Sequence, residues 1–255
     1  KGELELMVVD LADYDSIDAF VIALTKAHPK GVNVLINNAG IIPKSEYRES
    51  KYGYELTFQV NYLSTYVLTE KVIPMLEMAS NEGGVARVVN VGTMSVDETS
   101  NPVDWSQFPR SQKNFGGYHV DYAESKWMLT TYTSALHRRF EKDYKGQIQA
   151  VTADPGIIPG SDMWDDQTCC VRFMARYVFY CFTKSASQGA ATATYCAIES
   201  SDHIQSGKYY HSGVAYDARA DCIKEESWFK LEELTTKCLA THEDMKTKTK
   251  EEMKE

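Results

Sequence analysis

The chain has 255 residues, of which 43% are hydrophobic and 25% charged, a composition that is ordinary for a globular protein with a sizeable core. Its net charge of -9 argues against nucleic-acid partners, which need a basic surface, and gives no support for docking on an anionic membrane. No apolar run reaches the roughly 18 residues of a membrane span, and we find neither an internal repeat nor a linker.

Apolar runs of strand length alternate along the chain with stretches of helical periodicity. This alternation is typical of βαβ units, in which helices cover a parallel sheet. We predict buried parallel strands at 6–9, 32–36, 87–91 and 148–151, and a weaker last strand at 208–210.

Helices are predicted between these strands. In chain order they cover 16–27, 52–78, 118–144, 170–183, 187–200 and 224–239. Asp13 or Asp15 is suited to cap the first helix, and Pro74 is expected to kink or end the second. Residues 241–255 are rich in lysine and glutamate and lack an apolar face. We therefore expect one domain over 1–240, followed by a charged tail that is a frayed helix or disordered.

A long irregular connection is expected over 95–117, and loops of this length are usually functional or disordered, so we place it over the mouth of a site. The six cysteines show neither metal-ligand spacing nor a disulfide framework. A reducing compartment such as the cytoplasm is therefore the simplest expectation.

Two motifs follow predicted strands, at the edge of the sheet where open α/β folds bind ligands. The segment 37–40, Asn-Asn-Ala-Gly, allows backbone to approach a flat ligand closely and its asparagines to tie strands together, although Asn and Gly are also turn residues. The segment 90–93, Asn-Val-Gly-Thr, ends in a hydroxyl. Thr93 either binds a substrate oxygen or makes a local turn bond.

Tyr122 and Lys126 lie four residues apart in the predicted helix 118–144, so the phenol and the ammonium share one helical face. A free tyrosine has a pKa near ~10, and a neighbouring cation lowers it. Lowering it to about 7 requires roughly 4 kcal/mol, which a partly desolvated lysine with the help of a second nearby cation can supply. Such pairs are also common on solvated helix faces, so this pair is informative only together with the other motifs.

The strand-end Asn-Asn-Ala-Gly, the strand-end threonine and Tyr122-x-x-x-Lys126, in that order, resemble the short-chain dehydrogenase/reductase family over about residues 6–239. The resemblance implies a Rossmann-like, doubly wound parallel sheet in three α/β/α layers and an NAD(P)-dependent oxidoreductase. Segments 154–160 and 206–210 look most like the retinol dehydrogenase and protochlorophyllide reductase-like branch, which implies a small hydrophobic alcohol or carbonyl substrate. The aromatic stretch 173–182 fits a lid over such a pocket, although such spacing more often serves packing.

The same resemblance implies four residues for the chemistry. Tyr122 matches the acid/base, and Lys126 matches the residue that binds the nicotinamide ribose and lowers the tyrosine pKa. Asn61 matches the residue that holds a proton-relay water. Thr93 replaces the usual substrate-orienting serine, with Ser95 as a weaker substitute. The implied binding residues for NADP, with NAD as an alternative, are Asp10, Leu11, Asn37, Asn38, Ala39, Gly40, Tyr122, Lys126, Pro155, Gly156 and Ile158.

No Gly-rich turn precedes the predicted strand 6–9, so the N-terminal β-α-β portion that cradles the pyrophosphate in the family is absent from this sequence. Without it, strand 6–9 has no partner beside 32–36, and phosphate contacts worth about 4–9 kcal/mol are lost. We expect a fragment of a longer chain rather than a short form that cannot bind cofactor normally. The upstream residues would carry the choice between NAD and NADP and any membrane anchor.

Three functions stay open at this point. The first is interconversion of an alcohol and a carbonyl by hydride transfer. The second is a catalytically inactive partner that keeps the fold, suggested by the missing front and by Thr93. The third is epimerisation or dehydration with the same Tyr–Lys pair, but no length remains for the extra substrate domain that such relatives carry. The helices with Asn61 and Tyr122 form a dimer surface in many relatives, so a homodimer is a candidate assembly.

Overall fold

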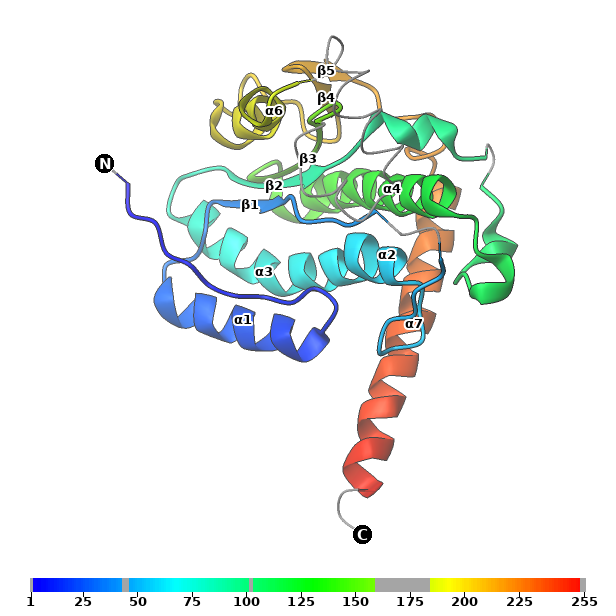
Figure 1. Cartoon of the computed structure of the whole chain (residues 1–255). Helices are drawn as coiled ribbons and strands as arrows, with labels where there is room; N and C mark the ends of the chain where they lie inside the picture. Colours follow the sequence, from blue (N-terminus) through cyan, green and yellow to red (C-terminus); the bar gives the residue numbers. More distant parts are fainter. Residues whose placement is uncertain (1, 43–45, 101–102, 159–183, 253–255) are drawn as a thin grey trace.

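A five-stranded sheet forms the centre of the chain, whose computed structural model describes residues 2–42, 46–100, 103–158 and 184–252 (Figure 1). In both spatial and chain order the strands are β1 (Val34–Asn37), β2 (Ala86–Val91), β3 (Ile148–Asp154), β4 (Tyr209–His211) and β5 (Val214–Tyr216). β1 to β4 are parallel, whereas β5 turns back antiparallel to β4. The antiparallel β5 was not predicted. The predicted α/β class is confirmed.

Helices cover both faces of the sheet (Figure 1). α3 (Ser64–Asn81) and α4 (Tyr118–Tyr144) pack on one face, and α6 (Ala186–Ile198) packs on the other. Neighbouring residues of a strand point to opposite faces, so Val88 and Val89 of β2 are both fully buried but belong to different core clusters. The doubly wound, three-layer arrangement expected from the sequence is therefore present.

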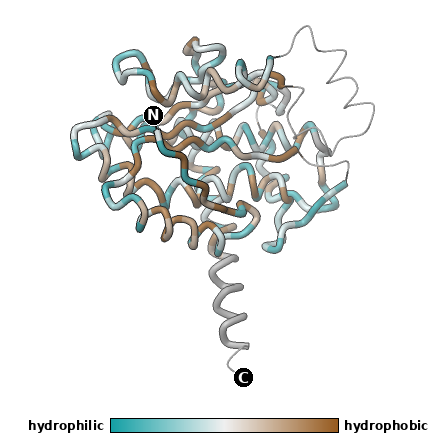
Figure 2. Tube along the Cα trace, turned by 60° about the vertical axis from the view of Figure 1, so that its left-hand side comes forward, coloured by the Kyte–Doolittle hydropathy of each residue, from teal (hydrophilic) through white to brown (hydrophobic). Residues whose placement is uncertain are grey.

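The predicted first strand at 6–9 is wrong. Residues 2–10 have no regular secondary structure, and the trace that follows the N-terminus contains hydrophobic residues (Figure 2). Leu6 and Val8 are 90% and 84% exposed despite their apolar character. The segment lies beside α1 (Tyr14–Ala27), where Glu5 is 3.6 Å from His28. A strand forms only where a neighbour accepts its backbone hydrogen bonds, and in the described residues β1 pairs with β2 alone.

The helix predicted over 52–78 is divided into three parts. A short α2 (Leu56–Phe58) leads into a π-helical turn (Gln59–Leu63), which continues as α3. Pro74 lies inside α3 and does not end it, because the helix runs on to Asn81. The π-helical turn contains Asn61, and such turns are frequent at functional sites.

The other helices lie close to their predicted positions. α1 is capped by Asp13, whose side chain accepts a hydrogen bond from the backbone of Asp15. α4 has the predicted bounds, while α7 (Glu225–Glu252) continues past residue 239 as a regular helix. The predicted helix at 170–183 and the proposed aromatic lid lie outside the described residues. No helix in the described part of the chain has the length and apolar character needed to cross a membrane.

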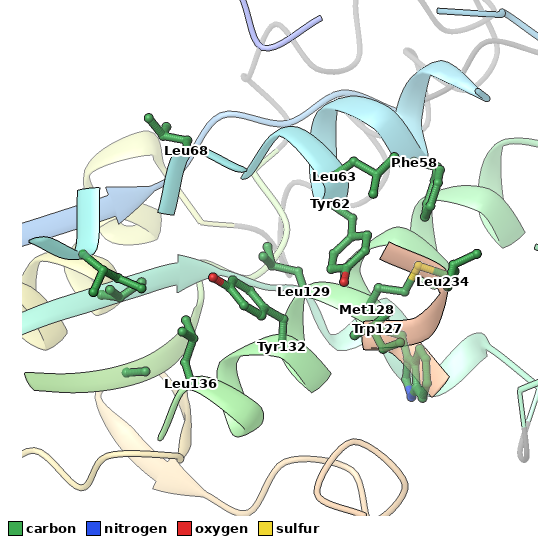
Figure 3. Close-up of a cluster of buried hydrophobic side chains, with 14 of the residues drawn as sticks. Phe58, Tyr62, Leu63, Leu68, Trp127, Met128, Leu129, Tyr132, Leu136 and Leu234 are labelled. Carbon is green, nitrogen blue, oxygen red and sulfur yellow. The ribbon is translucent and has the colours of Figure 1, made fainter. Parts of the chain in front are cut away.

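Large apolar side chains fix α4 against the π-helical turn and α7 (Figure 3). Trp127 and Met128 of α4 are buried in one cluster with Phe58, Tyr62 and Leu234. The Tyr62 hydroxyl also lies 2.6 Å from the Thr235 hydroxyl. This packing holds the segment that carries Tyr122 and Lys126 in a fixed relation to the turn that carries Asn61.

Candidate active site

The carboxyl ends of β1, β2 and β3 meet at one edge of the sheet. Asn37, Asn90 and Thr152 stand side by side in the parallel register. The Asn37 amide donates to the side-chain oxygen of Asn90 at 2.7 Å, and the Asn90 amide donates to Thr133 at 2.8 Å. The expected side-chain link between neighbouring strands at Asn37 is confirmed. It fixes the ends of β1 and β2, and therefore the starts of the loops that follow them, relative to each other.

Gly40 brings the first of these loops against α4 and the π-helical turn. A Cβ atom at Gly40 would lie 3.2 Å from Asn61 Oδ1 and 3.3 Å from Lys126 Nζ. Asn61 exchanges two hydrogen bonds with the backbone of Ile41, at 2.8 and 2.9 Å, and donates to Ser125 at 3.0 Å. The structure thus brings three of the predicted residues together, and the side chain of Asn61 clamps the loop to α4.

Lys126 is a buried cation, 2% exposed. Its ammonium donates to the backbone carbonyl of Val91 at 2.8 Å, the one hydrogen bond that it makes to the described residues. Burial lowers the pKa of Lys126 to about 8, while the negative charge of Asp154 acts in the opposite direction. An ammonium has three donors, so two remain to meet hydroxyl groups of a ligand.

The Thr93 side chain lies near enough to the Tyr122 hydroxyl to lower the pKa of that phenol. Thr93 also accepts from the backbone of Ser95 at 3.3 Å, so it makes the local turn bond as well. Burial raises the pKa of Tyr122 to about 12, the charge of Asp154 raises it further, and the Thr93 side chain lowers it. This direction is opposite to the lowering expected from Lys126, because the cost of burying a phenolate outweighs the other effects.

Asp154 is a site residue to which the sequence reading gave no role. It ends β3, is 1% exposed, and accepts from the Tyr209 hydroxyl at 2.7 Å and from the Gly156 backbone at 2.7 Å. His211 Nδ1 lies 3.2 Å from the same carboxylate. Two weak signals in the sequence point to this cluster. One is an acidic residue at the end of a buried strand, and the other is Tyr209 and His211, which are two residues apart on a strand and so lie on one face.

The turn after Asp154 holds the last predicted cofactor residues. Gly156 has φ +73°, a conformation that favours glycine, and the side chain of Lys184 packs over it. Pro155 and Ile158 are half-buried, and Ile158 lies against α6 at Gly189, where a Cβ would come within 2.1 Å of it.

Asp10 and Leu11 lie apart from this cluster. Asp10 makes its side-chain hydrogen bond to the backbone of Ala12, in the turn before α1, and Leu11 packs against the main core. Asn38 and Ala39 are exposed beyond the end of β1. The structure therefore gathers Gly40, Asn61, Thr93, Tyr122, Lys126 and the Pro155–Gly156 turn, and leaves Asp10 and Leu11 beside α1.

A second charged cluster lies beside Tyr122 at the start of α4. Arg110 donates twice to Glu124, at 2.8 and 2.7 Å, and once to the Asn114 carbonyl at 2.6 Å. Asp121 lies 3.2 Å from the same guanidinium. Burial and the nearby carboxylates raise the pKa of Asp121 to about 7, although Arg110 acts against this. Through Arg110 the cluster fastens the predicted irregular connection, which contains three short 3-10 turns, to α4.

In the described residues no group of three or more histidine, cysteine or acidic side chains has the geometry of a metal site. The polar groups that the described residues bring to this edge include the hydroxyls of Tyr122 and Thr93, the Lys126 ammonium and the buried Asp154 carboxylate.

Comparison with known proteins identifies relatives over most of the chain. A family model described as short chain dehydrogenase matches residues 1–103. An uncharacterized oxidoreductase of Schizosaccharomyces pombe is 28% identical over 88% of this chain and 67% of its own length. Human polyprenol dehydrogenase is 26% identical over 92% of this chain and 70% of its own length. Mouse retinol dehydrogenase 12 is 29% identical over 79% of this chain and 59% of its own length.

Solved structures share the fold. An uncharacterized protein from Mycobacterium paratuberculosis superposes with a TM-score of 0.64 at 22% identity, over 92% of this chain and 76% of that one. A 3-ketoacyl-(acyl-carrier-protein) reductase from Brucella melitensis, complexed with NADH, superposes with a TM-score of 0.57 at 19% identity. The match covers 79% of this chain and 74% of that one. The sheet topology and these matches agree: the chain is similar to short-chain dehydrogenases, retinol dehydrogenases among them, and shares their α/β fold.

Proposed function

We propose that this protein interconverts an alcohol and a carbonyl with a nicotinamide cofactor, and that Tyr122 is the acid/base. The observation that carries the proposal is the position of the buried Lys126 ammonium. It donates to the carbonyl of Val91, two residues before Thr93, and its helix carries Tyr122 one turn earlier. This combination supplies a proton, a second hydrogen bond for the same substrate oxygen, and a cation, all at the ligand-binding edge of the sheet.

Tyr122 would act first as a proton donor. Because its pKa is raised to about 12, the phenol is protonated at neutral pH. In reduction it donates its proton to the carbonyl oxygen, while Thr93 holds that oxygen with a second hydrogen bond. In oxidation the same phenol must lose its proton first, so a positive charge nearby has to offset the cost of the buried phenolate.

The residues present fit a nicotinamide cofactor. The space that a Cβ at Gly40 would occupy lies against Lys126, whose remaining donors suit the hydroxyls of a ribose. The exposed Asn38 and Ala39 would form one wall of the cleft, and Pro155, Gly156 and Ile158 the other. The cofactor supplies the hydride, and this chain holds the reacting atoms in place. We propose NADP, with NAD as the alternative.

Asn61 would complete the proton path. Its side chain is fully engaged with Ile41 and Ser125, so it acts by fixing the loop after Gly40 beside Lys126. A water held in this corner would connect Lys126 to solvent. Asp10 and Leu11 would contact the adenine end, remote from the reacting atoms.

The substrate would be hydrophobic. The support is the similarity to a polyprenol dehydrogenase and to retinol dehydrogenases, whose names state long apolar alcohols. The segment that could cover such a substrate, 159–183, lies outside the described residues.

The test is a Tyr122→Phe variant of the full-length protein, assayed for NADPH oxidation with a panel of long-chain apolar aldehydes. We expect turnover to fall by about 10²–10⁴-fold, the usual contribution of a positioned acid, with cofactor affinity unchanged. The matched control is Tyr132→Phe, which removes another buried tyrosine hydroxyl on α4, one bonded to Glu70. Turnover of Tyr122→Phe equal to that of the wild type would contradict the proposal.

A further inference from the structure

Asp154 places a buried negative charge beside the proposed reacting groups. The residue is 1% exposed and ends β3, next in the chain to Ala153, which stands beside Val91 in the parallel register. Val91 is the residue whose carbonyl accepts from Lys126. The carboxylate and the ammonium are thus held at the adjoining ends of two neighbouring strands.

The titratable groups around Asp154 come from four segments of the chain. α4 contributes Tyr122 and Lys126, and β4 contributes Tyr209 and His211. Lys184 packs over Gly156, where it donates to Ser212 at 3.0 Å. Asp97 acts on Tyr209 from the loop after β2. Among the described residues, Lys126 is the one fully buried cation of this group, and Asp154 is its buried anion.

We propose that Asp154 is a positioning residue for the reaction, the counter-charge that keeps the Lys126 ammonium protonated at neutral pH, and that Tyr209 and His211 orient its carboxylate. The catalytic consequence rests on the proposed function, whereas the charge coupling between Asp154 and Lys126 does not. A buried ammonium with one carbonyl acceptor is costly to keep charged, and an opposite charge nearby reduces that cost. The His211 side chain is about one-third exposed, whereas the carboxylate beside it is 1% exposed.

A purely structural role for Asp154 makes a different prediction. Its Oδ1 atom accepts from the Gly156 backbone and so stabilises the turn. Asparagine keeps an oxygen for that bond, and its amide can donate to the Tyr209 hydroxyl. Asp154→Asn therefore removes the charge and leaves the turn, so that charge and shape are separated in one variant.

The direct measurement is the titration of Lys126 by NMR in protein carrying isotope-labelled lysine, without cofactor or substrate. A Lys126→Met variant assigns the signal. The wild type is expected to titrate with a pKa of about 8. In Asp154→Asn the midpoint should fall by about one unit or more, because the anion that favours the ammonium is gone. Asp221→Asn is the matched control: it neutralises a buried carboxylate that pairs with Arg219, and it should leave the Lys126 midpoint unchanged.

Tyr209→Phe and His211→Gln keep the proposal falsifiable should Asp154→Asn fail to fold. The first removes a donor from the carboxylate without removing its charge, and the second replaces a ring that can carry positive charge by a neutral amide. Each concentrates the negative charge, so the Lys126 midpoint should stay at its wild-type value or rise. A midpoint that falls in either variant, or one that does not move in folded Asp154→Asn, overturns the proposal.

The catalytic readout is the pH profile of alcohol oxidation. Asp154 raises the pKa of both Tyr122 and Lys126, so its removal should move the acid limb of the profile to lower pH by about one unit, in the same direction as the NMR titration. A profile that stays in place while the NMR midpoint moves overturns the positioning role. Should the wild type lack oxidoreductase activity altogether, the proposed function fails, and the NMR result still decides the charge coupling.

Discussion

Two buried charge clusters lie on the first turns of α4, and they are built differently. Around Arg110 the guanidinium donates to Glu124 through two atoms, donates to the Asn114 carbonyl, and lies against Asp121. Around Lys126, one carbonyl of the described residues accepts from the ammonium, and Asp154, the buried carboxylate whose charge acts on it, is engaged by Tyr209 and the Gly156 backbone. In the first cluster the guanidinium donates three hydrogen bonds, whereas in the second the described residues accept one from the ammonium.

The difference separates a structural use of buried charge from a functional one. A cation that donates several hydrogen bonds fastens elements together. Here Arg110 fastens the connection before α4 to α4. An unsatisfied cation destabilises the fold and has value only when a ligand meets its donors. Stability should therefore depend on Arg110 and activity on Lys126, and three changes test this division.

The largest loss of stability is expected from Arg110→Met. The change leaves Glu124 and Asp121 buried, 4% exposed each, without their cation. Removing one partner of a buried pair typically costs about 3–5 kcal/mol, so thermal unfolding should occur at a markedly lower temperature. Arg138→Met, which removes an arginine of α4 that lies over the Trp228 ring, is a control for the loss of an arginine. A melting temperature within a degree or so of wild type would contradict the structural role.

Lys126→Met should have the opposite profile. The ammonium would no longer meet the cofactor ribose, and two lost charge-assisted hydrogen bonds should reduce NADPH affinity roughly 100-fold or more. Burial lowers the pKa of Lys126 from 10.5 to about 8. Below pH 8 the folded state therefore carries the buried charge at a cost in free energy of unfolding. That cost disappears as the pH rises from about 8 to 10.5, because the folded protein then loses its proton before the unfolded chain does. At neutral pH the variant should therefore melt at the wild-type temperature or above it. A strongly destabilised variant would break the comparison.

Asp121→Asn should give the smallest effect, one that depends on pH. The pKa of Asp121 is raised from 3.8 to about 7, so its protonated form stabilises the fold at low pH, and this contribution is lost as pH rises through about 7. The asparagine variant cannot ionise, so its stability does not fall as the pH rises through this range. It should match the wild type near pH 4 and be more stable above about pH 7, by at most about 4 kcal/mol. Chemical denaturation at the two pH values measures this, and equal differences at both would refute it.

Local patterns predicted much of the fold. The bounds of α4, the cap at Asp13 and the parallel strands all follow from short-range periodicity and capping chemistry. The segment at 6–9 has the composition of a strand, but composition does not supply the partner that a strand requires. The π-helical turn at Asn61 was missed because helical periodicity does not show one extra residue in a turn.

The candidate site was predictable in its residues but not in its electrostatics. Tyr122, Thr93, Lys126 and Asn61 were predicted from the resemblance to a known family, and the structure brings them to one corner. The direction of the Tyr122 pKa depends on its burial and on Asp154. Both are set by packing and by the β3–β4 register, which joins residues more than fifty positions apart, and no local pattern encodes them.

The most direct test of the account is the rate of carbonyl-dependent NADPH oxidation by the full-length protein and by Tyr122→Phe, from about pH 6 to about pH 9, with cofactor affinity measured in parallel. We expect the variant to be at least about 100-fold slower at every pH while it binds NADPH as tightly as the wild type. Equal rates for the two proteins would contradict the assignment of Tyr122 as the proton donor, and with it the proposed site.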